Sequence, residues 1–525
     1  MRSRFSDSVF FNAQVYTLDS KRRKARGLVV EDGMIVAVGS DDEIRKAAPR
    51  GSDRYDMGGK TVVPGFIDCH THFIQMGVDS ASVDLSRTST IEEAMVMMSA
   101  AAKRTPPGDW VIGTSWKESG WREARFITRK ELDDSCPNNP AVAHRVCGHL
   151  SSVNSKAIAL LGIDTKTPEV DVDGSGRLTG ILRESAVGIP RDATAPDANG
   201  KVRGLALAVR RAHQLGVTSI NDNAAPGDFE TYRAAERSGK LGVRVWYNTP
   251  SSSLEALLHL SLSSGIGSEW LKLGGVKIFC DGALGARTAA VSRSYADGPG
   301  NKGMLVHGES ELTDLVSRAN EAGFQLAVHA IGDVGIGAAL KSIVSALRKC
   351  PRGDHRHRIE HLELPSIDHL RTMQRHKIIA SMQPNFIGEW GGTNGMYLAR
   401  LGPDRVGRNN PFREVLDSGI RLVFGSDCMP FNPLYGIHSA VNAPFPSQRL
   451  SVEEAVAAYT REAAYASFEE SRKGTLSVGN HADFVTLSAD PFKHSDVISS
   501  LRVTKTVLGG RVVFSRAESR GNAER

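Results

Sequence analysis

Eight short apolar segments in the middle of the chain, separated by stretches of helical composition, limit the fold more than any other feature. They are VVPGFIDCH (62–70), GVTSIND (216–222), VRVWYN (243–248), VKIFC (276–280), QLAVHA (325–330), RIEHLE (358–363), IIASMQP (378–384) and RLVFGSD (421–427). Helical stretches such as KVRGLALAVRRAHQLG and ESELTDLVSRANEAG lie between them. Strands that alternate with helices indicate parallel βαβ units. Eight such units predict an α/β protein built on a (β/α)8 TIM barrel.

One connection in this series is far longer than the others. Residues 71–215 separate the first and second predicted strands, and within them the stretch 74–200 has strand-like pieces of its own, WVIGTSW and AVAHRVCGH. Because it follows a barrel strand, it should leave the barrel at the C-terminal face, where active sites of this fold lie. We therefore predict that residues 74–200 form an insertion over the active site.

Both ends of the chain have the composition of short β-strands. Near the N-terminus, LVVEDGMIVAVG places Asp32-Gly33 between two apolar runs, which is a strong hairpin signal. Near the C-terminus, GTLSVGNHADFVTLSADPF and VTKTVLGGRVVFS are short β segments with glycine turns. We predict one small β-sandwich domain built from residues 1–62 and 472–525, with the barrel in residues 63–471.

The composition is that of a soluble globular protein, with 40% hydrophobic and 24% charged residues. A net charge of +6 is small for 525 residues, and the basic run KRRKAR (21–26) is interpreted as a solvated loop, so no nucleic-acid partner is expected. No apolar run is long enough to span a membrane. The six cysteines form no CxxC pair, which favours a reducing compartment, and we expect a cytoplasmic protein. The oligomeric state, including a homo-oligomer, stays open.

Ionisable residues, most of them histidines, recur near the ends of the predicted strands. His70 and His72 end the first strand, and residues two apart in a strand face the same side. Lysine is rarely fully buried, yet one lies in the middle of the fourth strand, VKIFC. Imidazole is the commonest metal ligand, and carboxylates complete sites for zinc or similar ions. The whole set is His70, His72, Lys277, His329, His361 and Asp427.

Each of these residues also has an ordinary structural interpretation. A single strand-end histidine such as His329 is more often a hydrogen-bonded core residue, and Asp427 after Gly-Ser could be a helix N-cap. The joint pattern is harder to explain in that way, because five strands of one barrel place such residues at equivalent depths. The sequence therefore predicts a metal site at the barrel mouth.

The strand-end motifs resemble those of the amidohydrolase superfamily of metal-dependent hydrolases. Within it, the chain is similar to the branch that includes N-substituted formamide deformylase, amidohydrolase family 3. FGSDCMP departs slightly from the more usual GSDxPV of that branch, which affects a pocket wall rather than a ligand. The matching stretches are PGFIDCHTH (64–72), GHLSSVNSKA (148–157), TGILRE (179–184), VKIFCDGALGARTA (276–289), VHAIGD (328–333), RIEH (358–361), FGSD (424–427) and GNHADFVTL (479–487).

The resemblance implies two divalent metal ions, with Zn²⁺ favoured. One would be bound by His70, His72 and Asp427, and the other by His329 and His361. Lys277 would bridge them as a carbamate formed from CO₂. As an ammonium about 4 Å from a divalent ion, it would instead feel a repulsion of roughly 8 kcal/mol at an effective dielectric of 20.

The activity implied is hydrolysis of a non-peptide C–N bond by a metal-bridging hydroxide, with Asp427 transferring the proton. The expected partner is a small amide, formamide or cyclic amide. His149 and Arg287 are candidates to orient this substrate, with a structural contact as the alternative for both. A second hypothesis is a mononuclear deaminase-type enzyme in which Lys277 is not carboxylated. A non-catalytic scaffold is a third, but such a protein should have lost ligands, and all six are present.

Overall fold

The computed structural model describes residues 7–21, 24–118, 121–145, 150–493, 498 and 500–517. Its central feature is a sheet of eight strands in the order β21-β20-β19-β18-β17-β16-β15-β8, in which consecutive strands run parallel. Each strand overlaps one of the eight predicted segments, so the α/β TIM-barrel prediction is confirmed. The strands are β8 (Phe66–Thr71), β15 (Val217–Asn223), β16 (Arg244–Pro250), β17 (Leu271–Phe279), β18 (Leu326–Ala330), β19 (Arg358–His361), β20 (Ile379–Met382) and β21 (Leu422–Phe424).

Contacts just beyond β21 join the last strand to the first. The amide of Asp427 donates to the carbonyl of His70 at 2.7 Å, and the amide of Ser426 donates to Asp68 Oδ1 at 2.9 Å. Gly425 permits this approach, since a Cβ there would lie 2.4 Å from the His70 nitrogen. The joint that closes the barrel therefore also sets the position of two candidate metal ligands.

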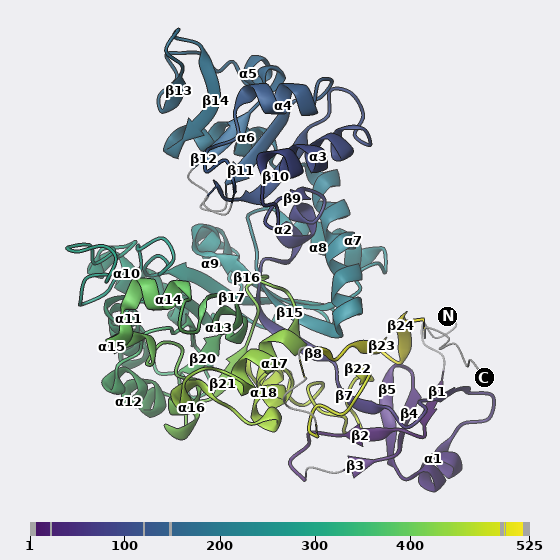
Figure 1. The fold of residues 1–525 in the computed structure, drawn as a ribbon. Coiled ribbons are helices and arrows are strands. Elements are labelled where there is room, and N and C mark those ends of the chain that lie inside the picture. Colours follow the sequence, from purple (N-terminus) through teal and green to yellow (C-terminus); the bar gives the residue numbers. More distant parts are fainter. Residues whose placement is uncertain are drawn as a thin grey trace. The chain divides into compact units, whose positions relative to one another are not determined.

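Helices connect the strands, as the alternating pattern predicts (Figure 1). The two helical stretches singled out in the sequence form α7 (Ala198–Leu215) and α10 (Glu309–Glu321). The other main helices of this part are α8 (Asp228–Arg237), α9 (Leu254–His259), α11 (Asp333–Lys349), α12 (Ile367–His376), α13 (Pro384–Trp390), α14 (Met396–Leu401), α15 (Pro403–Val406), α16 (Phe412–Asp417), α17 (Pro433–Val441), α18 (Val452–Ala458) and α19 (Arg461–Ala466). No helix among the described residues is both long and apolar enough to cross a membrane.

Two further sheets are formed by the ends of the chain: the first contains N-terminal strands alone, and the second combines strands from both ends. One has the order β5-β4-β1-β6 and the other β24-β23-β22-β7-β2-β3. The two sheets share a core that includes Phe10, Ile35 and Phe484. Their strands are β1 (Ser8–Phe11), β2 (Gln14–Tyr16), β3 (Lys24–Ala25), β4 (Gly27–Glu31), β5 (Met34–Gly39), β6 (Asp53–Asp56), β7 (Thr61–Pro64), β22 (Phe484–Leu487), β23 (Val503–Leu508) and β24 (Arg511–Ser515), with helix α1 (Asp41–Ala47) after β5.

The hairpin predicted at Asp32-Gly33 joins β4 to β5, and both turn residues have positive φ, 52° and 80°. The antiparallel pairing of β22 with β7 joins the C-terminal segment to the N-terminal one. The boundaries 1–62, 63–471 and 472–525 remain predictions.

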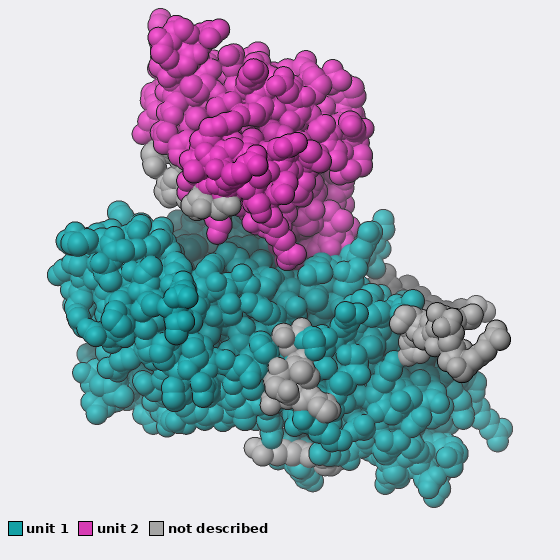
Figure 2. All heavy atoms as spheres, viewed as in Figure 1, with its two compact units in different colours: residues 1–73, 209–525 teal, residues 74–208 magenta. Residues whose placement is uncertain are grey.

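Residues 74–208 form a compact unit of their own, and Figure 2 colours it apart from residues 1–73 and 209–525. Its sheet has the order β13-β14-β12-β11-β10-β9, around a core that includes the stacked pair Trp116 and Trp121. The two pieces that looked strand-like in the sequence form β10 and β11. The elements are β9 (Val83–Asp84), β10 (Val111–Trp116), β11 (Ala141–Arg145), β12 (Leu150–Val153), β13 (Val170–Val172), β14 (Leu178–Arg183), α2 (Phe73–Asp79), α3 (Ile91–Ala102), α4 (Arg129–Ser135), α5 (Ser155–Leu161) and α6 (Gly188–Ala193).

Candidate metal centre

The six predicted ligands form one contiguous cluster at the C-terminal ends of the barrel strands. Their spacing follows from the parallel register, which pairs Ala330 with His361 and Phe279 with His329 on neighbouring strands. The imidazole centroids of His70 and His361 are 4.7 Å apart, and those of His329 and His361 are 4.4 Å apart. The chain thus brings together residues that are up to 357 positions apart in the sequence, as the distance from His70 to Asp427 shows.

Three of the residues form a preassembled donor set. Ligand atoms of His70, His72 and Asp427 all lie within 4.8 Å of one another. His72 Nε2 is 3.3 Å and His70 Nε2 is 3.6 Å from Asp427 Oδ1. Asp427 has a positive φ of 50°, a conformation that aspartate tolerates better than most residues. Two imidazoles and one carboxylate are donors that suit Zn²⁺ and similar ions.

Lys277 lies among these ligands and is buried, with 4% of its surface exposed. Its Nζ is 3.4 Å from His70 Nε2 and 4.9 Å from the ring centroid of Phe279. Burial lowers the pKa of the Lys277 ammonium to about 8, although Glu360 and Asp427 act in the opposite direction. A lysine with this pKa loses its proton far more readily than one in water.

The imidazoles of the cluster are held largely in their neutral form. Burial, with a smaller effect of Lys277, lowers the pKa of His70 and lowers that of His329 to about 3. Burial also lowers the pKa of His361 well below its usual value. His72 differs, because its contact with Asp427 outweighs burial and raises its pKa. Neutral imidazole is the form that binds metal ions.

His361 supplies a second sign that the donors fit a metal. Its Nδ1 is buried and has no hydrogen-bond partner among the described residues. An unpaired polar atom in the interior costs roughly 1–3 kcal/mol. A metal ion bound by the cluster could remove that cost. The donor set and this atom together fit a divalent ion.

Four buried carboxylates that the sequence analysis missed surround the candidate ligands. Asp68, Asp222 and Asp281 accept hydrogen bonds from backbone amides at or just beyond the strand ends, including those of His70, Phe73 and Ile331 respectively. The fourth, Glu360, contacts an imidazole directly: its Oε2 lies 2.5 Å from His70 Nδ1. An acidic residue inside an otherwise apolar strand segment was the available signal, as in FIDCH and RIEH.

The two predicted substrate-orienting residues differ in what the structure describes. Arg287 forms a bidentate pair with Asp297, with Nε to Oδ1 at 3.0 Å and Nη2 to Oδ2 at 2.9 Å. Asp297 also pairs with Arg400. This ion pair is the structural contact given above as the alternative for Arg287. A role of Arg287 in orienting the substrate remains a prediction. His149 lies outside the described residues.

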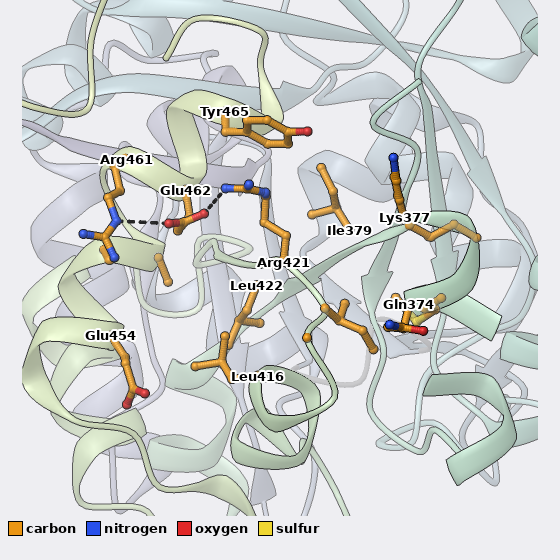
Figure 3. A pocket seen from close by; sticks show the side chains of 16 residues that line it. Gln374, Lys377, Ile379, Leu416, Arg421, Leu422, Glu454, Arg461, Glu462 and Tyr465 are labelled. Carbon is orange, nitrogen blue, oxygen red and sulfur yellow. Dashed lines mark hydrogen bonds and ion pairs between the residues drawn. The ribbon is translucent and has the colours of Figure 1, made fainter. Parts of the chain in front are cut away.

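A cavity of about 470 Å³ lies at the other end of the barrel strands, by the first residues of β20 and β21 (Figure 3). Three of its charged lining groups already pair with one another. Glu462 pairs with both Arg421 and Arg461, and Arg421 also lies over the ring of Tyr465 at 3.6 Å. None of the residues that line it is a candidate ligand, so the chemistry is better assigned to the cluster at the C-terminal ends.

Comparisons with known proteins agree with this geometry. Residues 54–514 match the amidohydrolase family, and residues 27–50 match an imidazolonepropionase-like composite domain of bacteria. The N-substituted formamide deformylase of Arthrobacter pascens is 29% identical over 98% of this chain and 99% of its own length. The protein LONG AFTER FAR-RED 3 of Arabidopsis thaliana is 31% identical over 97% of this chain and 92% of its own.

A solved structure extends the comparison to three dimensions. An uncharacterized metal-dependent hydrolase from Pyrococcus furiosus has a TM-score of 0.80 and 29% sequence identity, over 93% of this chain and 100% of its own. The family match spans every barrel strand that carries a candidate ligand. The chain therefore belongs to the amidohydrolase family of metal-dependent hydrolases.

Proposed function

We propose that the chain hydrolyses C–N bonds other than peptide bonds in small amides, formamides or cyclic amides. The observation that carries the proposal is the cluster of His70, His72 and Asp427, whose ligand atoms lie within 4.8 Å of one another beside a buried lysine. The likeness to N-substituted formamide deformylase along nearly the whole chain supports the choice of bond.

The residues of the cluster would hold two divalent ions, with Zn²⁺ favoured by the nitrogen and oxygen donors. His70, His72 and Asp427 form one donor set, and His329 with His361 forms the other. Bound divalent ions polarise a carbonyl group and lower the pKa of a bound water, which supplies a nucleophile at neutral pH.

Lys277 is proposed to carry a carboxylate derived from CO₂. The neutral amine attacks the carbon of CO₂, the nitrogen loses one proton, and a carbamate with two anionic oxygen donors forms. Burial lowers the pKa of the ammonium to about 8, which increases the fraction of neutral amine that this step needs. The product replaces a cation beside the donors with an anion that can serve both ions.

Asp427 is proposed to move the proton during turnover. Its carboxylate is near two imidazoles and has a pKa lowered by His70 and His72, which outweigh burial, so it is ionised and able to accept a proton. Asp427 would then pass this proton to the leaving nitrogen, so that the nitrogen leaves as a neutral amine rather than as an amide anion.

One observation supports the alternative of a mononuclear, deaminase-type enzyme. The tight three-residue group contains His70, His72 and Asp427, whereas His329 Nε2 is 3.0 Å from the carbonyl of Gly282 and so is engaged elsewhere. Metal stoichiometry separates the two mechanisms, since one ion per chain with unmodified Lys277 favours the deaminase type.

A substrate screen tests the proposed function. Metal-loaded protein would be incubated with N-formyl, N-acyl and cyclic amides, and amine release or ring opening would be measured by liquid chromatography. We expect turnover of at least one class, and its loss in the Asp427→Asn variant. Cleavage of dipeptides alone would instead identify a peptidase.

A further inference from the structure

The carboxylate of Glu360 contacts His70 from the side opposite the other candidate ligands. Glu360 and His70 are both almost fully buried, with exposures of 0% and 1%. Glu360 Oε2 is 2.5 Å from His70 Nδ1, while His70 Nε2 is 3.4 Å from Lys277 Nζ and 3.6 Å from Asp427 Oδ1. The two ring nitrogens therefore face different partners.

Two side chains, one on its own strand and one on the neighbouring strand, hold Glu360 in place. Arg358, two residues earlier on β19, places its Nε 2.6 Å from Oε1. Ser381 is the register partner of Glu360 on β20, and its hydroxyl donates to Oε2 at 2.7 Å. Arg358 in turn donates from Nη2 to the carbonyl of Cys69 at 3.0 Å, which connects it to the strand that carries His70. Oε2 is thus held by a hydrogen bond, and Oε1 by an ion pair that lacks hydrogen-bond geometry.

This contact dictates which nitrogen of His70 carries the proton. An ionised carboxylate only accepts hydrogen bonds, so the neutral imidazole must place its proton on Nδ1. The lone pair is then on Nε2, which faces Asp427. A carboxylate or carbonyl that holds the distal nitrogen of a ligand histidine in this way sets both its tautomer and its ring orientation.

We propose that Glu360 is a positioning residue that holds His70 in the metal-binding tautomer. The inference rests on the proposed metal site. His329 Nε2 faces the carbonyl of Gly282 at 3.0 Å and lies farther, 3.8 Å, from Asp281 Oδ1, while the buried Nδ1 of His361 has no hydrogen-bond partner among the described residues. Glu360 would thus act on one ligand of the cluster rather than on all of them.

The first measurement is the tautomer of His70 in metal-free protein, by nitrogen-15 NMR of labelled histidine, with the signal assigned through His70→Asn. In the native chain we expect a protonated Nδ1. In Glu360→Asp, which keeps a charge for Arg358 but shortens the side chain, and in Glu360→Gln we expect a mixture of tautomers. A native His70 with its proton on Nε2 would overturn the inference, whatever the metal content.

The second measurement is the affinity for Zn²⁺, by competition with a coloured chelator. Loss of such a partner typically weakens metal binding by about 10–100-fold, which is the expected effect of Glu360→Asp. Ser381→Ala is the matched control, because it removes a different donor from the same oxygen and should have a smaller effect. Unchanged affinity in Glu360→Asp and Glu360→Gln would leave Glu360 as only a counter-charge for Arg358. If the native chain binds no Zn²⁺ but shows the expected tautomer, the proposed function fails instead.

Discussion

At the scale of single residues, Lys277 is explained by its surroundings rather than by its strand. The ammonium is buried beside neutral imidazoles, and burial lowers its pKa to about 8. Glu360 and Asp427 reduce the cost of the charge without removing it. The lysine could be singled out from sequence because it interrupts an apolar strand, whereas Glu360 could not be assigned, since its contact with His70 joins two strands that are 290 positions apart.

Replacement of Lys277 by alanine should weaken metal binding, because the bridging anion is lost. Elemental analysis after loading should show fewer ions per chain than in the native protein, and an added short carboxylic acid should restore part of the activity. Lys272→Ala is the matched control, since Lys272 is on the same strand but pairs with Glu469 at 2.9 Å. Equal metal content in the native and Lys277→Ala chains would argue against the bridge.

Asp427→Asn should remove most turnover while the fold remains intact. The amide cannot accept the proton, and general acid–base groups contribute about 10²–10⁴-fold to rate. The reduction would be measured as kcat on a substrate from the screen, with circular dichroism to verify the fold. Near-native kcat would remove Asp427 from the proton-transfer role.

At the scale of elements, the ligand residues at the strand ends could be predicted from sequence. The tertiary hydrogen bonds that hold these strand ends in place could not. The period-two pattern of His70 and His72, and the apolar runs around them, are local features of the sequence. Asp222 is different: it accepts from the amide of Phe73 and from the hydroxyl of Tyr232, which are contacts of tertiary structure. A buried carboxylate of this kind is visible in sequence only as an acid in an apolar segment, without its partners.

The closing joint of the barrel provides a test at this scale. Gly425→Ala would place a Cβ 2.4 Å from the His70 nitrogen, so the strand ends must separate. Overpacking of this kind typically costs about 1–3 kcal/mol, and we also expect weaker metal binding because His70 shifts. Gly353→Ala is the control, since a Cβ there has no atom within 4 Å among those described. Chemical denaturation of both variants would measure the effect, and equal stability would contradict it.

At the scale of the whole molecule, a buried ion pair joins the C-terminal β segment to the barrel. Arg244 on β16 donates from Nε to Asp483 Oδ2 at 2.7 Å, and the exposures are 2% and 5%. The sequence indicated that both ends of the chain are β-rich. It could not show which strands pair, because the pairing of β22 with β7 joins residues more than 400 positions apart.

Asp483→Asn should destabilise the chain at pH 7 by about 3–5 kcal/mol, because it removes the close carboxylate from the buried Arg244 and leaves the more distant Glu269, 3.8 Å away. Arg244 holds the pKa of Asp483 below its usual value against the effect of burial. The stabilisation is therefore complete above the unfolded pKa of about 3.9 and is lost as pH falls through the lower folded pKa. Denaturation curves of the native and variant chains should converge over that acidic range. A constant difference would contradict this account.

The compact unit of residues 74–208 should set substrate choice. Exchange of this segment for the corresponding one of a relative should change the ratio of kcat/KM values between formamides and cyclic amides. Metal content should remain native, since all six candidate ligands lie outside the segment. An unchanged preference after the exchange would assign specificity to the loops of the barrel.

The most direct test of the central claim is the metal content of the purified, metal-loaded chain, measured by inductively coupled plasma mass spectrometry. The proposed binuclear centre predicts close to two divalent ions per native chain and a clear reduction in a His70→Ala, His72→Ala double variant. One ion per chain would favour the mononuclear alternative. A native chain that retains no divalent ion, or a double variant that retains the native amount, would contradict a metal centre at these strand ends.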